Sequence, residues 1–137
     1  MICLDSSFLI DRFRDREYAE TFLESIDADV PIIVPTIVLH ELFSGALRMD
    51  HSESVEDIRH ELTGTRFTSF DADAAEEAAE IRATLADRGE SINKLDVLIA
   101  GVARQAGATV VAVDRDFGRV PDLDVRDPKV EVGEGGQ

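Results

Sequence analysis

The sequence feature that most constrains the fold is a set of short apolar runs that end abruptly in polar residues. Ile2–Leu4 is continuously apolar and leads directly into Asp5. Because this run does not alternate apolar with polar residues, it predicts a strand buried on both faces, as in a parallel sheet. Ligands of open α/β sheets bind beyond the carboxyl ends of the strands. Asp5 therefore lies where such a fold places its chemistry, although a carboxylate that only forms a turn or a cap fits the same pattern.

Patterns typical of strands alternate with patterns typical of helices along the chain. The predicted strands span residues 2–4, 31–35, 66–70, 108–113 and 123–125. The predicted helices span residues 7–26 with a break at 14–16, 37–49, 52–62, 71–88 and 94–105. Ser6 or Ser7 can cap the first of these helices. The connections are long enough for crossovers, so we predict an α/β sandwich around a mostly parallel sheet.

The length of 137 residues suits one domain with a core of its own. We expect this domain at residues 1–127 and a flexible tail rich in Gly and Glu at 128–137. No apolar run approaches the ~20 residues of a membrane span, and no basic segment precedes an apolar stretch at the N-terminus. Cys3 is the single cysteine, so no intramolecular disulfide can form. These features predict a cytoplasmic location and no membrane partner.

The charge balance is strongly acidic, with 29 acidic and 14 basic residues and a formal net charge of −15. Such a surface repels nucleic acid in dilute salt. At ~1 M salt the Debye length falls to ~3 Å, and most of this repulsion vanishes. A nucleic-acid function therefore predicts a halophilic source. The alternative is a mesophilic acidic protein whose partner is basic.

Two carboxylates lie on predicted helices at positions where apolar residues are expected. Glu41 is at the edge of the apolar stripe that contains Ile37 and Val38. The helical neighbours of Asp96 include Ile92, Ile99, Ala100 and Ala103, which are all apolar. Each has an ordinary alternative: Glu41 as a solvated glutamate, and Asp96 as a third helical residue that bonds back to the cap at Asn93.

Asp114 and Asp116 directly follow residues 108–113, the clearest predicted strand. An Asp-Arg-Asp sequence also suits a surface turn. In the predicted fold, Asp114 converges with the three acids above on one edge of the sheet. Clustered carboxylates repel one another, and hard cations such as Mg²⁺ or Mn²⁺ are their usual counter-charge. The sequence therefore predicts a divalent-metal site at this edge.

Four motifs, in this order, resemble those of PIN-domain ribonucleases and specifically of the VapC-type toxins of toxin–antitoxin pairs. They are Leu4–Ile10, Pro35–Leu42 with Gly45, Asp96–Ala100 with Ala103, and Val110–Phe117. The resemblance covers residues 2 to about 126. It implies a PIN-like α/β/α sandwich and a Mg²⁺- or Mn²⁺-dependent endoribonuclease that cuts RNA and arrests translation. It also implies a homodimer and a cognate antitoxin that blocks the site.

The resemblance assigns metal binding and catalysis to the four acids Asp5, Glu41, Asp96 and Asp114. It adds Asp116 as a further metal ligand and Ser6 or Ser7 as supporting groups. Asp5, Asp96 and Asp114 hold one or two ions, and Glu41 binds metal or orients the attacking water. One departure is Ala112, which stands where the family often has Thr or Ser. Four basic residues near the motifs could contact RNA phosphates or form exposed salt bridges: Arg12, Lys94, Arg115 and Arg119.

Three other interpretations fit parts of the sequence. A catalytically inactive PIN-like binding or scaffold module would keep the fold, but the intact set of acids argues against it. A receiver-like phosphoacceptor domain needs a lysine at the end of a later strand, and neither Lys94 nor Lys129 is so placed. A metal-dependent phosphatase needs Asp-x-Asp after the first strand, where this chain has Asp5 followed by two serines.

Overall fold

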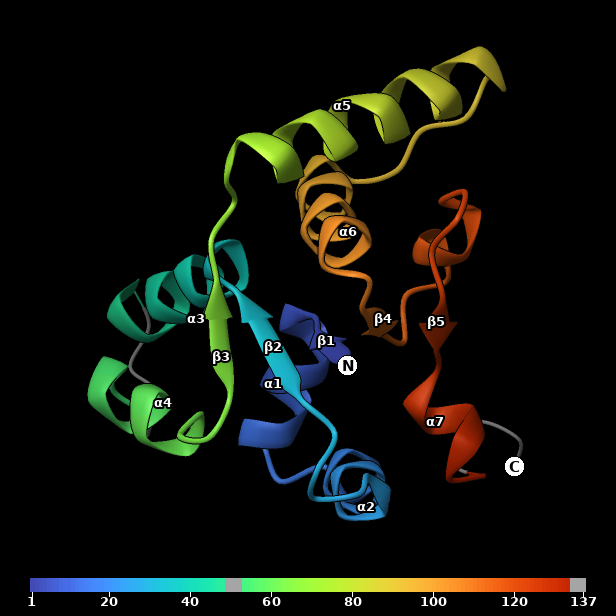
Figure 1. Cartoon of the computed structure of the whole chain (residues 1–137). Coiled ribbons are helices and arrows are strands. Elements are labelled where there is room, and N and C mark those ends of the chain that lie inside the picture. Colours follow the sequence, from blue (N-terminus) through green and yellow to red (C-terminus); the bar gives the residue numbers. More distant parts are fainter. Residues whose placement is uncertain (49–52, 134–137) are drawn as a thin grey trace.

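The computed structural model describes residues 1–48 and 53–133, and its centre is one parallel sheet. The strands are β1 (Ile2–Leu4), β2 (Ile32–Pro35), β3 (Arg66–Thr68), β4 (Thr109–Val111) and β5 (Val125–Arg126). They lie in the order β3-β2-β1-β4-β5, and every neighbouring pair is parallel (Figure 1). The predicted α/β class is confirmed, with a sheet that is wholly parallel among the described residues.

Helices connect successive strands, as the sequence pattern predicted. They are α1 (Ser6–Phe13), α2 (Glu17–Ser25), α3 (Thr36–Arg48), α4 (Val55–Glu61), α5 (Ala72–Asp87), α6 (Lys94–Ala106), the 3₁₀ helix η1 (Arg115–Arg119) and α7 (Pro128–Glu131). The predicted break at 14–16 separates α1 from α2, and Asp15 there has a positive φ of 59°. Met49 and Ser52, at predicted helix ends, lie outside the described residues. No helix in the described part of the chain could cross a bilayer.

Only the first predicted strand keeps its bounds in the structure. The second and fourth are shortened to Ile32–Pro35 and Thr109–Val111. The third strand ends at Thr68, two residues earlier than predicted, because its pairing with β2 stops at Pro35. The last strand is shifted from 123–125 to Val125–Arg126, where two residues pair with β4. Apolar runs locate a strand, but the hydrogen-bonding partner across the sheet decides where it starts and stops.

The core lies around the central strand β1, whose three residues are all buried. Neighbours on both sides and helices on the faces explain why this strand is continuously apolar. Phe8 of α1 makes edge-to-face contacts with Tyr18 and Phe22 of α2, with ring centroids 6.2 and 5.8 Å apart. Each buried aromatic of this size contributes about 1.5–3 kcal/mol through the hydrophobic effect. This packing fixes α1, and with it the end of β1, against the sheet.

Helix α6 packs very closely against α5. A Cβ atom on Gly101 would lie 2.8 Å from the carbonyl oxygen of Ala74 and 2.8 Å from the Cβ of Ala78. Small side chains therefore set the distance between the two helices, which lie side by side in Figure 1. Because Asp96 is on α6, this contact also fixes the position of one of the predicted site residues.

The C-terminal segment contains a helix that the sequence analysis missed. We expected a flexible tail at 128–137, but α7 occupies its first four residues, and Pro128 is buried. Asp127 caps the helix, and proline suits the first helical position because it has no N–H to leave unpaired. Asp-Pro was therefore the signal that could have found it. Residues 134–137 lie outside the described residues.

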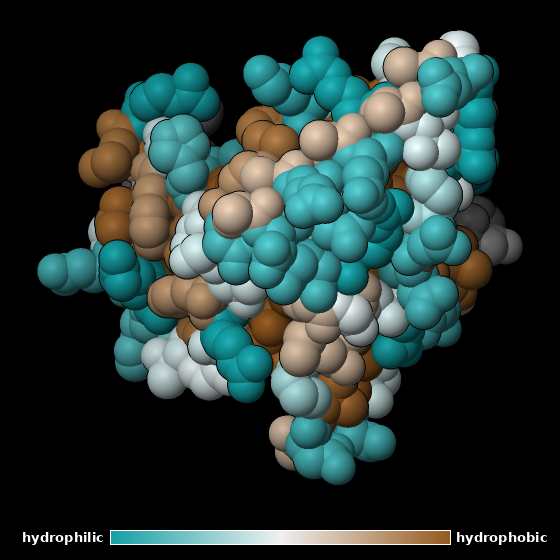
Figure 2. All heavy atoms as spheres, turned by 45° about the horizontal axis from the view of Figure 1, so that its top comes forward, coloured by the Kyte–Doolittle hydropathy of each residue, from teal (hydrophilic) through white to brown (hydrophobic). Residues whose placement is uncertain are grey.

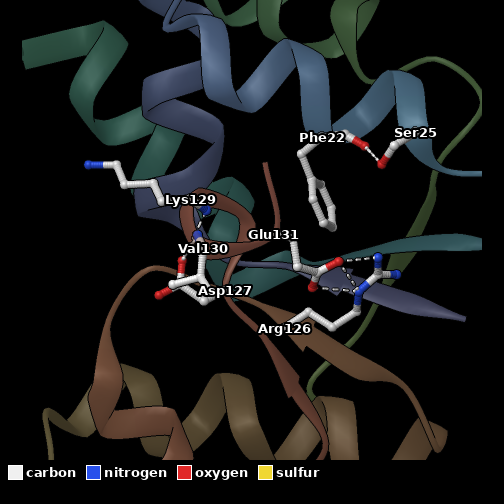
Figure 3. Close-up of polar contacts among 7 residues, drawn as sticks. All are labelled: Phe22, Ser25, Arg126, Asp127, Lys129, Val130 and Glu131. Carbon is white, nitrogen blue, oxygen red and sulfur yellow. Dashed lines mark hydrogen bonds and ion pairs between the residues drawn. The ribbon is translucent and has the colours of Figure 1, made fainter. Parts of the chain in front are cut away.

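Side-chain contacts hold α7 and β5 against α2 (Figure 3). The guanidinium of Arg126 forms an ion pair with Glu131 at 2.6 Å and lies 4.9 Å from the centroid of the Phe22 ring. The Lys129 ammonium lies 5.1 Å from the centroid of the Tyr18 ring. The described chain is thus packed against the domain well past residue 127, where we had placed its end.

Candidate metal centre

The carboxyl ends of β1 and β4 lie side by side, because Leu4 is paired with Val111 in the sheet. Asp5 follows β1 directly, and Asp114 follows β4 after two residues. The chain runs outward from β1 through β2 to β3, then returns to the other side of β1 as β4. Such a reversal of strand order opens a crevice at the carboxyl ends of the strands, where ligands of α/β sheets bind.

Asp5 both caps α1 and takes part in the acidic cluster. Its side chain is 3% exposed and accepts a hydrogen bond from the N–H of Phe8 at 2.9 Å. Asp5 is thus the cap that we had predicted at Ser6 or Ser7, because its carboxylate reaches the open N–H groups of the first turn. Burial raises the pKa of Asp5 to about 7, and the charges of Asp114 and Glu41 act in the same direction.

Glu41 is linked to the end of β1 through Ser6. The hydroxyl of Ser6 donates a hydrogen bond to Oε1 of Glu41 at 3.0 Å. This bond joins α1 to α3 and turns the partly exposed Glu41 carboxylate toward the other acids. Of the two serines named as supporting groups, Ser6 therefore has a contact with a predicted site residue, whereas Ser7 is exposed.

Asp96 is the third residue of α6 and is half-buried. The cap Asn93 accepts a hydrogen bond from the N–H of Leu95, at 2.9 Å. A carboxylate oxygen of Asp96 lies within 4.8 Å of one from Asp114 across the site. Burial raises the pKa of Asp96 to about 7, and the charges of Asp114 and Asp5 act in the same direction. Asp96 therefore lies beside Asp114 and Asp116, and this arrangement differs from the alternative in which its carboxylate bonds back to the cap at Asn93.

Asp116 joins Asp96 and Asp114 in a compact group. One carboxylate oxygen from each of the three residues lies within 4.8 Å of the others. Asp114 caps η1 by accepting a hydrogen bond from the N–H of Asp116 at 2.9 Å, which holds the two residues together. Three anionic oxygen donors at this spacing suit a hard divalent cation. Mg²⁺ or Mn²⁺ therefore fits the donor set, and Asp5 and Glu41 lie outside this group of three.

Two further residues at the site differ from what the motifs suggested. Ala112 is buried, and its N–H donates to the carbonyl oxygen of Arg126 at 3.1 Å, so the chain offers no hydroxyl at this position. Arg119 forms an ion pair with Asp116, with Nη1 and Oδ1 3.6 Å apart. The sequence analysis had left Arg119 among several unassigned cations. Its spacing of three residues from Asp116 on one helix was the signal that could have singled it out.

An open groove of about 650 Å³ adjoins Glu41. Its apolar lining comes from four helices and includes Ile10, Phe13, Leu42, Ile58 and Leu95. Its basic residues are Arg14, His40 and Arg48. Ile10 and Leu95 are 37% and 38% exposed, so the groove offers apolar side chains to solvent. The acidic centre thus lies beside a mainly apolar groove whose charged lining includes both basic residues and the acids Glu41 and Glu53.

The sequence matches the family model of the PIN domain over residues 2–123. The fold is similar to that of VapBC2 from Rickettsia felis, solved with a DNA fragment from the promoter (TM-score 0.83, 25% identity, covering 92% of this chain and 98% of that chain). It is also similar to FitAcB from Neisseria gonorrhoeae (TM-score 0.79, 24% identity, covering 93% of this chain and 98% of that chain). VapC20 from Mycobacterium tuberculosis, a sarcin-ricin loop cleaving toxin, shares the fold (TM-score 0.66, 21% identity, covering 90% of this chain and 99% of that chain). No curated protein matches the sequence.

Proposed function

The chain belongs to the PIN domain family, and we propose that it is a Mg²⁺- or Mn²⁺-dependent endoribonuclease and the toxin of a toxin–antitoxin pair. The observation that carries this proposal is the group of carboxylates at the switch point of the sheet. Three of them offer oxygen atoms within 4.8 Å of one another, and burial raises the pKa values of Asp5 and Asp96. A site that collects anions at this energetic cost is suited to a divalent cation.

The acids divide into three roles in the proposed hydrolysis of an RNA phosphodiester. Asp96, Asp114 and Asp116 supply ligand oxygens. Asp5 is held rigidly by its bond to the N–H of Phe8 and adds a desolvated negative charge behind them. Glu41, oriented by Ser6, accepts a proton from the attacking water. A divalent cation held by these residues would supply Lewis acidity, which lowers the pKa of a water molecule and neutralises charge on a phosphoryl group.

Replacement of Asp96 by asparagine tests the nuclease. Asp96→Asn keeps the shape of the side chain and removes an anionic ligand, so RNA cleavage with Mn²⁺ should fall by about 10³-fold or more. Asp87→Asn is the matched control, because it removes the same charge from an exposed residue at the end of α5. Wild-type cleavage by a normally folded Asp96→Asn protein would reject this site. If the wild type itself cuts no RNA with Mn²⁺, the inactive binding module becomes the better interpretation.

The antitoxin is proposed to block the centre from the groove beside Glu41. Exposed Ile10 and Leu95 suit the apolar face of a partner segment, and the acids suit a basic side chain at its tip. Expression of the chain alone should arrest growth and translation in its native host, and co-expression of the partner should restore both. An equally toxic Asp96→Asn variant would show that any toxicity does not come from RNA cleavage.

A homodimer is also part of the proposal. A second groove of about 410 Å³ between α5 and α6 has a mainly apolar lining that includes Phe70, Ile92 and Leu98. Burial of such a surface by a second copy would remove it from water. Light scattering should give the mass of a dimer, and Leu98→Glu should shift the protein toward the monomer. A wild type that is monomeric at all concentrations would reject the dimer.

A halophilic, cytoplasmic setting would reconcile the acidity with an RNA substrate. Hydrophilic residues cover most of the face shown in Figure 2, as expected for a chain with net charge −15. Salt at molar concentration screens both self-repulsion and repulsion of RNA. The melting temperature should therefore rise between 0.1 and 2 M KCl. A melting temperature that is the same at both concentrations would reject the halophilic setting.

A further inference from the structure

Arg119 is the one cation that forms an ion pair with a carboxylate of the proposed centre within residues 1–48 and 53–133. Its Nη1 atom lies 3.6 Å from Oδ1 of Asp116. The same carboxylate is one of the three whose oxygen atoms lie within 4.8 Å of one another. Asp116 therefore faces a guanidinium on one side and two like charges on the other.

The backbone of η1 keeps Arg119 beside Asp116. Phe117, which lies between Asp116 and Arg119 in the sequence, is completely buried, and Asp114 caps the start of the helix. The two paired side chains are 53% and 34% exposed, and exposed ion pairs contribute little to stability. The pair can thus open at small cost, while the backbone of Arg119 stays next to the centre.

Charge decides which state of Arg119 is preferred. In the metal-free chain the guanidinium compensates part of the negative charge around Asp116. When Asp116 ligates a divalent cation, the two positive charges repel each other, and the attraction that held the guanidinium there is lost. The nearest new anion would then be the phosphate of a bound substrate. The planar guanidinium donates two parallel hydrogen bonds to such a group, which a lysine does not.

We propose that Arg119 pairs with Asp116 in the metal-free chain and holds the phosphate of the substrate once Asp116 binds a divalent cation. The inference rests on the proposed function, because it assumes a phosphodiester substrate and a cation at this site. Arg119 is then a substrate-binding residue that also competes with the metal for a ligand. The two roles predict opposite effects of one substitution.

Titration with Mn²⁺ tests the competition. Arg119→Gln removes the competing charge, so calorimetry at the lowest KCl concentration that keeps the protein folded should show Mn²⁺ affinity increased about threefold, the size expected of an exposed ion pair. Arg115→Gln is the matched control: this neighbouring arginine is exposed and has no ion pair to the centre among the described residues. An unchanged or lower affinity of Arg119→Gln overturns the proposal, as does an equal increase in the control.

Cleavage of an RNA oligonucleotide tests the phosphate contact. Arg119→Gln should lower kcat/KM about tenfold, mainly through a higher KM, because a charge-assisted bond to the substrate is lost. Arg119→Lys should return Mn²⁺ affinity to the wild-type value and recover only part of KM. A value of kcat/KM equal to wild type in Arg119→Gln overturns the proposal. Melting curves should match for all variants, since Arg119 is exposed.

The two measurements separate this inference from the proposed function. Binding of Mn²⁺ needs no nuclease activity, so the titration reports on Arg119 and Asp116 alone. A wild-type chain that binds Mn²⁺ and cuts no RNA would refute the proposed function and the phosphate contact together, and the titration would still decide the competition. A chain that cuts RNA but shows no gain in Mn²⁺ affinity with Arg119→Gln would refute only the present inference.

Discussion

Asp5 and Asp114 follow neighbouring parallel strands, and each caps the helix that comes next. Each accepts a backbone N–H at 2.9 Å, from Phe8 in one case and from Asp116 in the other. Their surroundings differ, because Asp5 is 3% exposed and Asp114 is exposed to solvent. The same local motif therefore produces one desolvated and one hydrated carboxylate.

This difference separates two tasks within one acidic site. Asp5 caps helix α1, which packs on α2 through aromatic contacts, and burial raises the pKa of that carboxyl. The short helix η1 leaves Asp114 open, where its oxygen can approach those of Asp96 and Asp116. In the proposed function, the buried side of the site would supply a carboxylate held in one position, and the open side would supply ligands that a cation and a substrate can reach.

The largest difference between Asp5 and Asp114 is expected in their effects on the stability of the metal-free protein. The raised pKa of Asp5 means that ionisation is disfavoured in the folded state. Stability is then lost as the pH rises from the ordinary value of 3.8 to about 7. Asp5→Asn keeps the cap and should recover this loss above pH 7, with about 4 kcal/mol as an upper bound, since each pKa unit corresponds to about 1.4 kcal/mol. Below pH 4 it should recover nothing.

Urea unfolding with chelator at pH 4 and pH 8 measures this effect. Asp114→Asn is the control for an exposed carboxylate. Its unfolding free energy should rise less at pH 8, because water already solvates the charge of Asp114. Equal gains for the two variants at pH 8 would show that burial does not distinguish these carboxylates.

Stabilisation by Mn²⁺ should show the opposite ranking. A ligand at a hundredfold excess over its Kd stabilises the native state by about 2.7 kcal/mol. The wild type should reach this value, Asp5→Asn should keep part of it, and Asp114→Asn should lose most of it, because Asp114 belongs to the group of three oxygens. Thermal unfolding with and without Mn²⁺ at constant high ionic strength measures the gain. If Mn²⁺ stabilises Asp114→Asn as much as the wild type, Asp114 is not a ligand.

The smallest expected effect concerns the side-chain bond on the buried side of the site. Ser6→Ala removes the donor to Glu41 and should lower the unfolding free energy by about 1 kcal/mol. Ser7→Ala alters the neighbouring exposed hydroxyl and should change it less. Chemical denaturation at pH 7 measures both. If Ser7→Ala is the more destabilising of the two, Ser6 does not restrain Glu41.

Much of the fold could be predicted because each strand has its own local signal. Apolar runs without alternation located β1, β2 and β4, whereas the segments that located β3 and β5 mix apolar and polar residues. The predicted bounds of β2, β3, β4 and β5 were wrong because pairing across the sheet sets them. Helix α7 was missed because the composition of the last residues was given more weight than the Asp-Pro signature before them.

The sequence predicted which residues belong to the candidate site better than it predicted how they contact one another. Carboxylates at strand ends and on apolar helix faces identified Asp5, Glu41 and Asp96, and the structure orients them toward one another. Their assignment as metal ligands stays a prediction. Contacts between distant segments, such as Ser6 with Glu41, have no local pattern that marks them.

The amino-acid sequence alone determined which residue types stand at the ends of β1 and β4, because the order of apolar runs and acids is a local property of the chain. Parallel strands bring such ends to one edge of the sheet, so convergence of the acids followed from topology. Only the tertiary structure decided which acid is buried and which is open. Burial depends on helices α1 and η1 and on what packs over each, and desolvation by that packing sets the energy of the charge.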